Sequence, residues 1–385
     1  MERLCHETVL KCGDIVKHPD PYDGAEHLVT SGQGLIFTAY DYEKQKLVVI
    51  KKTKYNLCNI RQIQNQEQID RYERAKNVYR EFELGILVNH ENIMNILDAY
   101  TPDTTFQSFQ DIYLVFELMD QRDLRHFHFH NWNEICHHQK GAPLIADIML
   151  QLFSAIAYLH QDKLRLIHRD IKPDNIFIKQ FGEGNYIVKL GDLGHARQIP
   201  PKEGQPMTMN ITTTQYRAPE VMKSELYSIP IDIWSAGCVL AEILVPPNLQ
   251  KPLDNALFNS DDPKIVSQMH CQLTALTITT KFTNNRLPQW KNVEKWGEYF
   301  RYILENTLKL VPSERLKAAE IIELNPFEML NMEKYKFEPV TDVYEEKAEN
   351  FRVDWRMKIY DKLKDFNQKR MEEIQRRQNE NNLQN

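Results

Sequence analysis

Two segments near the middle of the chain constrain its fold more than any other feature. They are LIHRDIKPDNIFI, residues 166–178, and VKLGDLGHAR, residues 188–197. In each, apolar residues flank a short polar stretch, which predicts a strand, a turn and a second strand. The apolar residues are expected to fix the backbone, so that the polar side chains project from the turns.

The pattern on either side of these segments changes along the chain. Residues 28–50 predict a run of short strands, residues 70–89 a helix, and residues 111–119 a buried strand. Residues 142–161 and 231–244 predict long helices, the second apolar on all sides. Strands first and helices later indicate an α+β fold with a small β-rich lobe followed by a larger helical lobe.

Composition argues against several other classes of protein. The net charge of −6 and the pI of about 6.1 give no electrostatic case for nucleic acid as a direct partner. The first residues lack the apolar stretch of a secretory signal, and no uninterrupted apolar run reaches the roughly 18 residues of a membrane span. The six cysteines are scattered without a CxxC pair, which favours reduced thiols and a cytoplasmic and nuclear location.

The polar residues of the two central segments suit phosphoryl transfer. Asp170 and Asn175 lie in one loop, and Asp192 lies in the next. Because Mg²⁺ prefers oxygen ligands and keeps several waters, a carboxylate and an amide suffice to hold it. Asp170 is then available to accept a proton from a substrate hydroxyl, and Lys172 can reach the transferring phosphate. The alternative is a loop that merely carries surface acids.

Four phrases carry a resemblance to a known family. They are NHENIMNILDAYTP, FQDIYLVFELMD, IHRDIKPDNI and YRAPEV. With them the chain resembles the eukaryotic protein kinases, and within them the mitogen-activated kinases, most closely the c-Jun N-terminal kinase branch. The resemblance implies the bilobal kinase fold. It divides the chain into an N-terminal extension at 1–26, a small lobe with the αC helix at 27–119, a large lobe at 120–331, and a C-terminal extension at 332–385 that packs on the kinase domain and ends in disordered residues.

The resemblance implies a nucleotide site that binds ATP. Lys51 would pair with the α- and β-phosphates, and Glu81 on the αC helix would hold Lys51 in place. The residues implied to surround ATP are Val29, Ser31, Gly32, Gly34, Ile36, Lys51, Glu81, Glu117 and Met119.

The resemblance also implies the catalytic roles. Asp170 would be the catalytic base, with Lys172 and Thr213 beside it, and Asn175 and Asp192 would be the magnesium ligands. The residues implied to stabilise the large lobe are Asp232, Glu220 and Arg315.

The phosphate loop departs from the family pattern G-x-G-x-x-G. Val29 and Ser31 stand at the first two glycine positions, Gly34 stands at the third, and Gly32 is displaced by one position. Glycine lets backbone N–H groups approach a phosphate closely, so we expect a weaker grip on the nucleotide. A pseudokinase or scaffold of the same fold therefore remains an alternative. Retention of the catalytic side chains favours the enzyme.

The activation segment departs from the family at its regulatory positions. Thr208 stands where the family carries a phosphorylated threonine, but Asn210 replaces the phosphorylated tyrosine. Thr214 replaces an arginine that pairs with this phosphotyrosine in the family. The arginines implied to bind a phosphothreonine are Arg80, Arg169 and Arg197. We expect activation by phosphorylation of Thr208 alone. The alternative is that Thr208 is an unmodified loop residue.

The resemblance implies the partners as well. An upstream dual-specificity kinase of a stress-activated cascade would switch the protein on. The substrates would be proteins, transcription factors among them, phosphorylated on serine or threonine before proline. Thr214 weakens the expectation of proline, because the arginine it replaces helps to shape that pocket. No membrane partner is expected.

Two further segments allow more than one interpretation. Residues 125–138 contain five histidines and a cysteine, and His126 and His130 could hold a metal from one helix face, although a solvated surface is favoured. The charged segment at 342–385 carries an apolar stripe that favours packing on the kinase domain over a short coiled coil. The stripe consists of Trp355, Ile359, Leu363 and Phe366.

Overall fold

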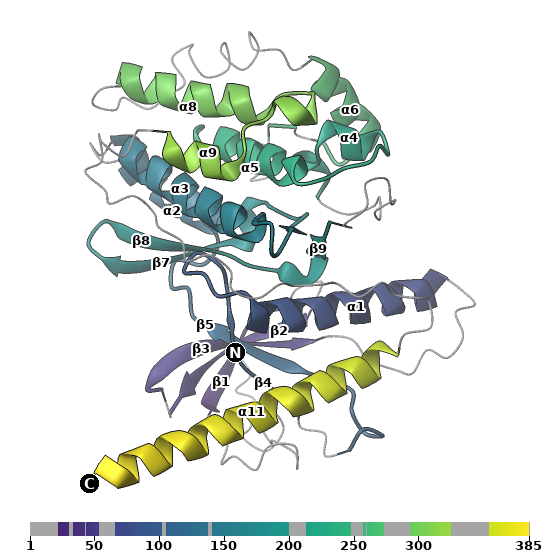
Figure 1. Ribbon diagram of the computed structural model, residues 1–385. Helices are drawn as coiled ribbons and strands as arrows, with labels where there is room; N and C mark the ends of the chain where they lie inside the picture. The colour runs from purple at the N-terminus through teal and green to yellow at the C-terminus, as the bar shows by residue number, and fades with distance from the viewer. Residues whose placement is uncertain are drawn as a thin grey trace. The chain divides into compact units, whose positions relative to one another are not determined.

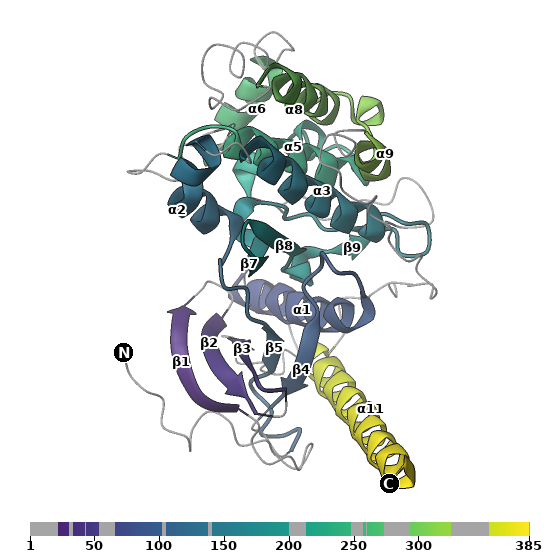
Figure 2. The same ribbon diagram turned by 90° about the vertical axis from the view of Figure 1, so that its left-hand side faces the viewer.

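The protein forms two compact units in a computed structural model (Figures 1 and 2). The structure describes residues 22–30, 34–42, 44–53, 66–101, 105–137, 141–199, 213–247, 257–258, 260–272, 293–324 and 354–384. The first unit falls within residues 1–89, 94–118 and 347–385, and the second within residues 90–93 and 119–346.

The first unit contains a five-stranded sheet in the order β1-β2-β3-β5-β4, with antiparallel neighbours. Its strands are β1 (Tyr22–Thr30), β2 (Gly34–Asp41), β3 (Lys46–Thr53), β4 (Ile96–Tyr100) and β5 (Tyr113–Glu117). In β3, Val48 and Ile50 are fully buried, whereas Lys51 is only partly buried. Successive side chains of a strand point to opposite faces of the sheet, so Lys51 lies on the face opposite to Val48 and Ile50. The register places Lys51 opposite Ile36 on β2 and Leu114 on β5.

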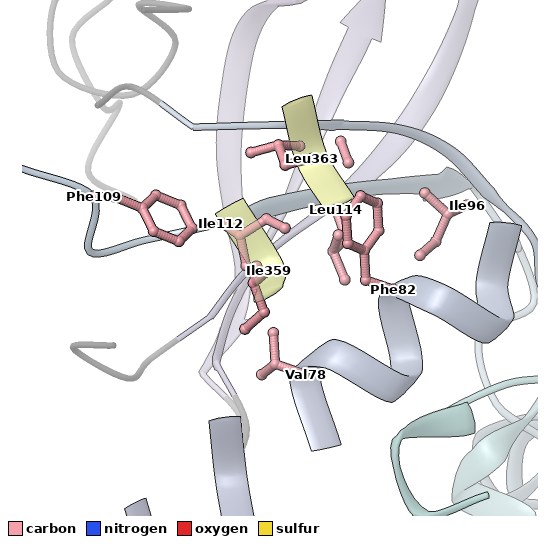
Figure 3. Close-up of a cluster of buried hydrophobic side chains, with 9 residues drawn as sticks. Val78, Phe82, Ile96, Phe109, Ile112, Leu114, Ile359 and Leu363 are labelled. Carbon is pink, nitrogen blue, oxygen red and sulfur yellow. The ribbon is translucent and has the colours of Figure 1, made fainter. Parts of the chain in front are cut away.

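Two helices pack with this sheet, α1 (Gln66–Leu87) and α11 (Trp355–Gln384). Their shared core joins side chains from three distant parts of the chain (Figure 3). Its buried members include Val78, Phe82, Ile96, Phe109, Ile112, Leu114, Ile359 and Leu363. Ile359 and Leu363 lie four residues apart, so they share one face of α11. That face covers α1 and β4, as the apolar stripe of the tail predicts.

The end of the chain differs from the sequence prediction. The polar composition predicts disorder for the last dozen residues, whereas α11 is helical to Gln384. Ion pairs spaced four residues apart stabilise its exposed part, between Lys369 and Asp365 at 3.0 Å and between Arg377 and Glu373. Such pairs support a helix that little tertiary packing covers, which composition alone does not reveal.

The second unit is mostly helical. Its helices are α2 (Leu124–His137), α3 (Gly141–Leu159), α4 (Pro219–Met222), α5 (Pro230–Ile243), α6 (Pro263–Gln272), α8 (Val293–Thr307) and α9 (Ala318–Glu323). Among the described residues, the 3-10 turns of this unit are η1 (Pro173–Asn175), η2 (Leu193–His195), η3 (Thr214–Tyr216) and η5 (Pro312–Glu314). The sequence prediction of an α+β fold is thus confirmed, with the larger sheet in the first unit and most helices in the second.

Two small sheets carry the polar turns of the second unit. β7 (Ile176–Gly182) and β8 (Asn185–Leu190) form a hairpin. Along the chain, the paired strands β6 (Leu166–Ile167) and β9 (Arg197–Gln198) come before and after this hairpin. The polar stretch around Asp170 therefore runs from β6 through η1 to β7. The stretch around Asp192 runs from β8 through η2 to β9. Both segments have the predicted strand, turn and strand.

The predicted helices occur with shifted ends. The helix expected at 70–89 is α1, which begins at Gln66, and the helices expected at 142–161 and 231–244 are α3 and α5. Of the described helices, α3 is the one whose length and apolar content would suit a membrane span, and 83% of the stretch tested is buried inside the structure. Such burial is what a core helix shows.

Candidate active site

A buried aspartate from α5 holds the loop that carries Asp170. Oδ2 of Asp232 accepts from the backbone N–H of His168 at 2.8 Å, and Oδ1 accepts from that of Arg169 at 3.0 Å. The Nε2–H of His160 donates to Oδ2 at 2.9 Å. Burial would raise the pKa of Asp232, but the hydrogen bond from His160 and the neighbouring charges hold it below its usual value. These bonds also fix Arg169 in a left-handed conformation with φ of 69°.

The carboxylate of Asp170 receives four hydrogen bonds from three residues, Lys172, Asn175 and Thr213. Lys172 Nζ and Asn175 Nδ2 donate to Oδ2 at 2.8 and 2.9 Å. The backbone N–H and the hydroxyl of Thr213 donate to Oδ1 at 3.3 and 3.2 Å. Lys172 Nζ also donates to the Thr213 hydroxyl at 2.9 Å. The carboxylate is therefore an oriented acceptor, which is what a general base requires.

The two predicted magnesium ligands have oxygen atoms suited to a metal. Both bonds donated by the Asn175 side chain, to the carbonyl and carboxylate of Asp170, use its nitrogen, which leaves its carbonyl oxygen as the atom suited to a cation. The backbone N–H of Gly191, next to Asp192, donates to the backbone carbonyl of Asn175 at 2.9 Å and ties the two turns together. A carboxylate and an amide are the hard oxygen donors that Mg²⁺ prefers, so these residues fit that ion.

In the first unit, Lys51 and Glu81 form a partly buried ion pair. Lys51 Nζ donates to both carboxylate oxygens of Glu81, at 2.6 and 2.8 Å. The side chains are 12% and 10% exposed. Lys51 lies on β3 and Glu81 lies on α1, so the pair fixes the helix against the sheet. The contact expected between them is present, and their roles toward ATP stay predictions.

The phosphate-loop positions are described in part. Val29 lies on β1 and is paired with Ile36 on β2, while Ser31 and Gly32 lie outside the described residues. Gly34 begins β2, and a Cβ there would lie 2.1 Å from the carbonyl oxygen of Lys52. The close approach of β3 therefore requires glycine at this position, whatever its part in nucleotide binding.

The residues predicted to hold the adenine and the phosphothreonine are divided between the two units. Glu117 ends β5 in the first unit, and Met119 belongs to the second. Arg80 is buried on α1, and Arg197 lies on β9. The guanidinium of Arg169 donates to the His195 carbonyl at 2.7 Å and to the Tyr227 hydroxyl at 3.2 Å. Thr208 lies outside the described residues.

The pair predicted to stabilise the large lobe is in place. Both terminal nitrogens of Arg315 donate to Glu220, at 2.6 and 2.8 Å, and the Arg315 side chain is fully buried. The guanidinium also lies 5.0 Å from the ring centre of Trp234. This pair joins the segment after the activation loop to η5.

Sequence reasoning missed a partly buried arginine, Arg125, which contacts the loop that carries Asp170. Arg125 on α2 contacts Asp174, Glu242 and Tyr216 at distances of 2.6–3.0 Å. Asp174 and Tyr216 stand inside phrases that the sequence singled out, but Arg125 stands in the histidine-rich segment. Nothing in its local pattern indicates partners almost fifty or more residues away.

The histidine-rich segment is partly buried. His128 is 4% exposed, and burial lowers its pKa to about 4. The rings of His126 and His130 stack with centres 3.9 Å apart. The prediction of a solvated surface overlooked that Leu124, His128 and Ile135 share the packed face of α2. In the part of the chain that the structure describes, no group of three His, Cys, Asp or Glu side chains is placed to hold a metal.

Comparison with known proteins agrees with this geometry. Residues 26–327 match the protein kinase domain family. The stress-activated protein kinase JNK of Drosophila melanogaster is 35% identical over 215 residues, which cover 56% of this chain and 50% of that protein. GLH-binding kinase 1 of Caenorhabditis elegans is 29% identical over 327 residues, which cover 79% of this chain and 77% of that protein. The chain thus spans half the length of the first relative.

Proposed function

Because the chain belongs to the protein kinase family, we propose that it is an active enzyme that transfers the γ-phosphate of ATP to serine and threonine hydroxyls of proteins. The observation that carries the proposal is the Asp170 carboxylate, which Lys172, Asn175 and Thr213 hold as an oriented acceptor. The predicted resemblance to the c-Jun N-terminal kinase branch is confirmed by the Drosophila relative.

The chemistry follows from these contacts. Asp170 accepts the proton of the substrate hydroxyl, whose oxygen bonds to phosphorus while the bond from phosphorus to the departing ADP oxygen breaks. Lys172 bridges Asp170 and Thr213, and its ammonium group stabilises negative charge on the transferring group. When bound, ATP and Mg²⁺ supply the phosphoryl group and neutralise its charge. Asn175 and Asp192 would hold the metal ions, and Lys51, kept in place by Glu81, would orient the phosphates.

The finer specificity rests on resemblance. The relative named as a stress-activated kinase supports placement in a stress-activated cascade, below a dual-specificity kinase that phosphorylates Thr208. Protein substrates followed by proline, transcription factors among them, fit the same likeness. The scattered cysteines support a location in the cytoplasm and the nucleus.

The activation proposal has its own test. If phosphorylation of Thr208 alone activates the enzyme, treatment with an active upstream kinase should raise the rate of phosphate transfer by the wild type. The same treatment should leave Thr208→Ala protein at its basal rate of transfer. An Asn210→Ala variant is the matched control, because it alters the neighbouring regulatory position without removing the hydroxyl. Equal stimulation of Thr208→Ala and wild type would refute a Thr208 switch.

Phosphate transfer from radiolabelled ATP to a mixed protein substrate tests the enzyme itself. Asp170→Asn should abolish transfer. Asp162→Asn makes the same chemical change at an exposed position of the same unit and should leave transfer intact. A thermal shift with ATP and Mg²⁺ separates the alternative, since a ligand that binds the native state raises stability. A wild type that neither transfers phosphate nor shows this shift would be a scaffold, disabled at Val29 and Ser31.

A further inference from the structure

Arg125 on α2 lies between two carboxylates of the second unit. Its Nη1 donates to Glu242 at 2.6 Å, and its Nε and Nη2 donate to both oxygens of Asp174, at 3.0 and 2.9 Å. Nη2 also donates to the Tyr216 hydroxyl at 2.9 Å, and that hydroxyl donates to Glu242 at 2.5 Å. A guanidinium that forms a two-pronged bond with one carboxylate and a single bond with another is among the strongest polar contacts in proteins.

The network adjoins the catalytic base on two sides. Asp174 follows Asp170 by four residues in the same loop and lies in η1. Tyr216 follows Thr213, whose hydroxyl and N–H contact Asp170, within η3. A substrate must bring its hydroxyl to Asp170. Because an extended chain rises about 3.3 Å per residue, side chains two or three residues from the phosphorylated one come level with this network.

The exposure of the three charged groups shows which of them a substrate could meet. The Asp174 side chain is 46% exposed, that of Arg125 is 16% exposed, and that of Glu242 is 3% exposed. Burial raises the pKa of Glu242, while the hydrogen bond and charge of Arg125 hold the pKa of Asp174 below its usual value even though burial opposes this. Asp174 and Glu242 both contact the guanidinium of Arg125. Without this cation between them, the two carboxylates would repel each other and attract another cation from outside.

We infer that Arg125 is a specificity-determining residue: it occupies the place between Asp174 and Glu242 that a basic side chain of the substrate would otherwise fill. The kinase therefore does not select arginine or lysine beside its target residue. Loss of Arg125 exposes the two acids and creates that selection. The inference rests on the proposed function, since it concerns the peptide that the enzyme phosphorylates.

A peptide library tests this inference. Each peptide carries one serine or threonine, and each flanking position is varied in turn through arginine, alanine and glutamate. Wild type should show no preference for arginine. Arg125→Ala should raise kcat/KM for an arginine peptide at one or more flanking positions by roughly tenfold over the matching alanine peptide, mainly through KM, because the new ion pair forms on binding.

A second variant tests the same network with opposite sign. Asp174→Asn keeps Arg125 and Glu242 in contact but removes the exposed carboxylate, so Arg125 should now favour glutamate at the same flanking position. Arg301→Ala is the matched control, because Arg301 is an exposed arginine of α8 that pairs with Glu305 at 4.0 Å. Its profile should equal that of the wild type.

The outcomes separate the two proposals. Absence of transfer from wild type to any peptide would overturn the proposed kinase function. Transfer with an arginine preference already in the wild type, or with the same profile in both variants and the wild type, would overturn the role of Arg125. If Arg125→Ala fails to fold, as judged by loss of its thermal transition, Asp174→Asn decides: a shift toward glutamate supports the inference and an unchanged profile refutes it.

Discussion

Arg370 on α11 forms an ion pair with the buried carboxylate of Asp98 on β4. The Asp98 side chain is 5% exposed and that of Arg370 is 18% exposed. Asp98 also accepts from the N–H of Ala99 at 2.8 Å. With the apolar contacts of Ile359 and Leu363, this ion pair makes the last helix of the chain a structural part of the first unit.

Arg370→Ala should destabilise the first unit by about 3 kcal/mol, because it leaves a buried carboxylate without its ion pair. Lys369→Ala is the matched control at the next position. Lys369 pairs with Asp365, and both side chains are more than half exposed, so its loss should cost less than about 1 kcal/mol. Urea unfolding followed by tryptophan fluorescence would report the difference, since Trp355 lies on α11. Equal midpoints for the two variants would show that the Asp98 ion pair adds nothing.

Because Lys51 is held by Glu81, its replacement should reduce catalysis, whereas replacement of the neighbouring Lys52 should not. Lys51→Met should lower kcat/KM by about 100-fold or more, as expected when a group that orients the transferring phosphate is removed. Lys52→Met is the control, since Lys52 points to the other face and pairs with Asp111 at 3.0 Å. Its kcat/KM should stay within about threefold of the wild type. Similar losses in both variants would point to damage of β3 and not to a catalytic role.

Much of the candidate site could be predicted because its residues are close in the chain. Asp170, Lys172 and Asn175 share one turn, and their apolar flanks fix the strands on either side. The same holds for the turn that carries Asp192. Short-range patterns of this kind are visible in the sequence because the backbone period and the turn residues are local.

The partners that the sequence could not predict are buried charges from distant segments. Arg125 meets Glu242, and Arg370 meets Asp98, only after helices have packed. A charged residue of an amphipathic helix looks like part of a solvated face until its burial is known. The exposed part of α11 carries ion pairs spaced four residues apart, between Lys369 and Asp365 and between Arg377 and Glu373, which an apolar pattern does not indicate.

Gly237 in α5 is another position that only the packing explains. A Cβ there would lie 2.5 Å from Oγ1 of Thr307 and 2.9 Å from the Leu308 side chain. Gly237→Ala should therefore destabilise the second unit by about 1–3 kcal/mol despite the better helix propensity of alanine. Gly182→Ala, where the nearest atom lies at 3.4 Å in an exposed hairpin, should change stability by less than about 0.5 kcal/mol. Thermal unfolding compares them, and a Gly237→Ala protein as stable as wild type would refute the steric argument.

Removal of the metal should separate binding of the nucleotide from structure. Chelation of divalent ions, or Asp192→Asn, should abolish most of the rise in melting temperature that ATP with Mg²⁺ gives the wild type. The melting temperature without nucleotide should stay the same for the chelated wild type. Asp262→Asn on an exposed segment is the control and should keep the full shift. A full shift in Asp192→Asn would exclude Asp192 as a metal ligand.

The stability of the second unit should fall as the pH falls below about 6.5, because His90 is buried as a neutral imidazole. Its Nδ1 accepts from the N–H of Asn92 at 3.1 Å, and its Nε2 lies 3.3 Å from the hydroxyl of Ser154. Burial, with a smaller effect from the charge of Lys189, lowers the pKa of His90 to about 4. Between pH 6.5 and 4 the unfolded chain then binds a proton that the folded protein does not, so stability declines through this window and levels off below it. The full loss from a shift of this size is about 3 kcal/mol.

His90→Asn should reduce the dependence of stability on pH between 5 and 7 relative to the wild type. His130→Asn, which alters an exposed imidazole on α2, should preserve that dependence. Identical slopes for wild type and His90→Asn would show that His90 binds protons equally in the folded and unfolded states.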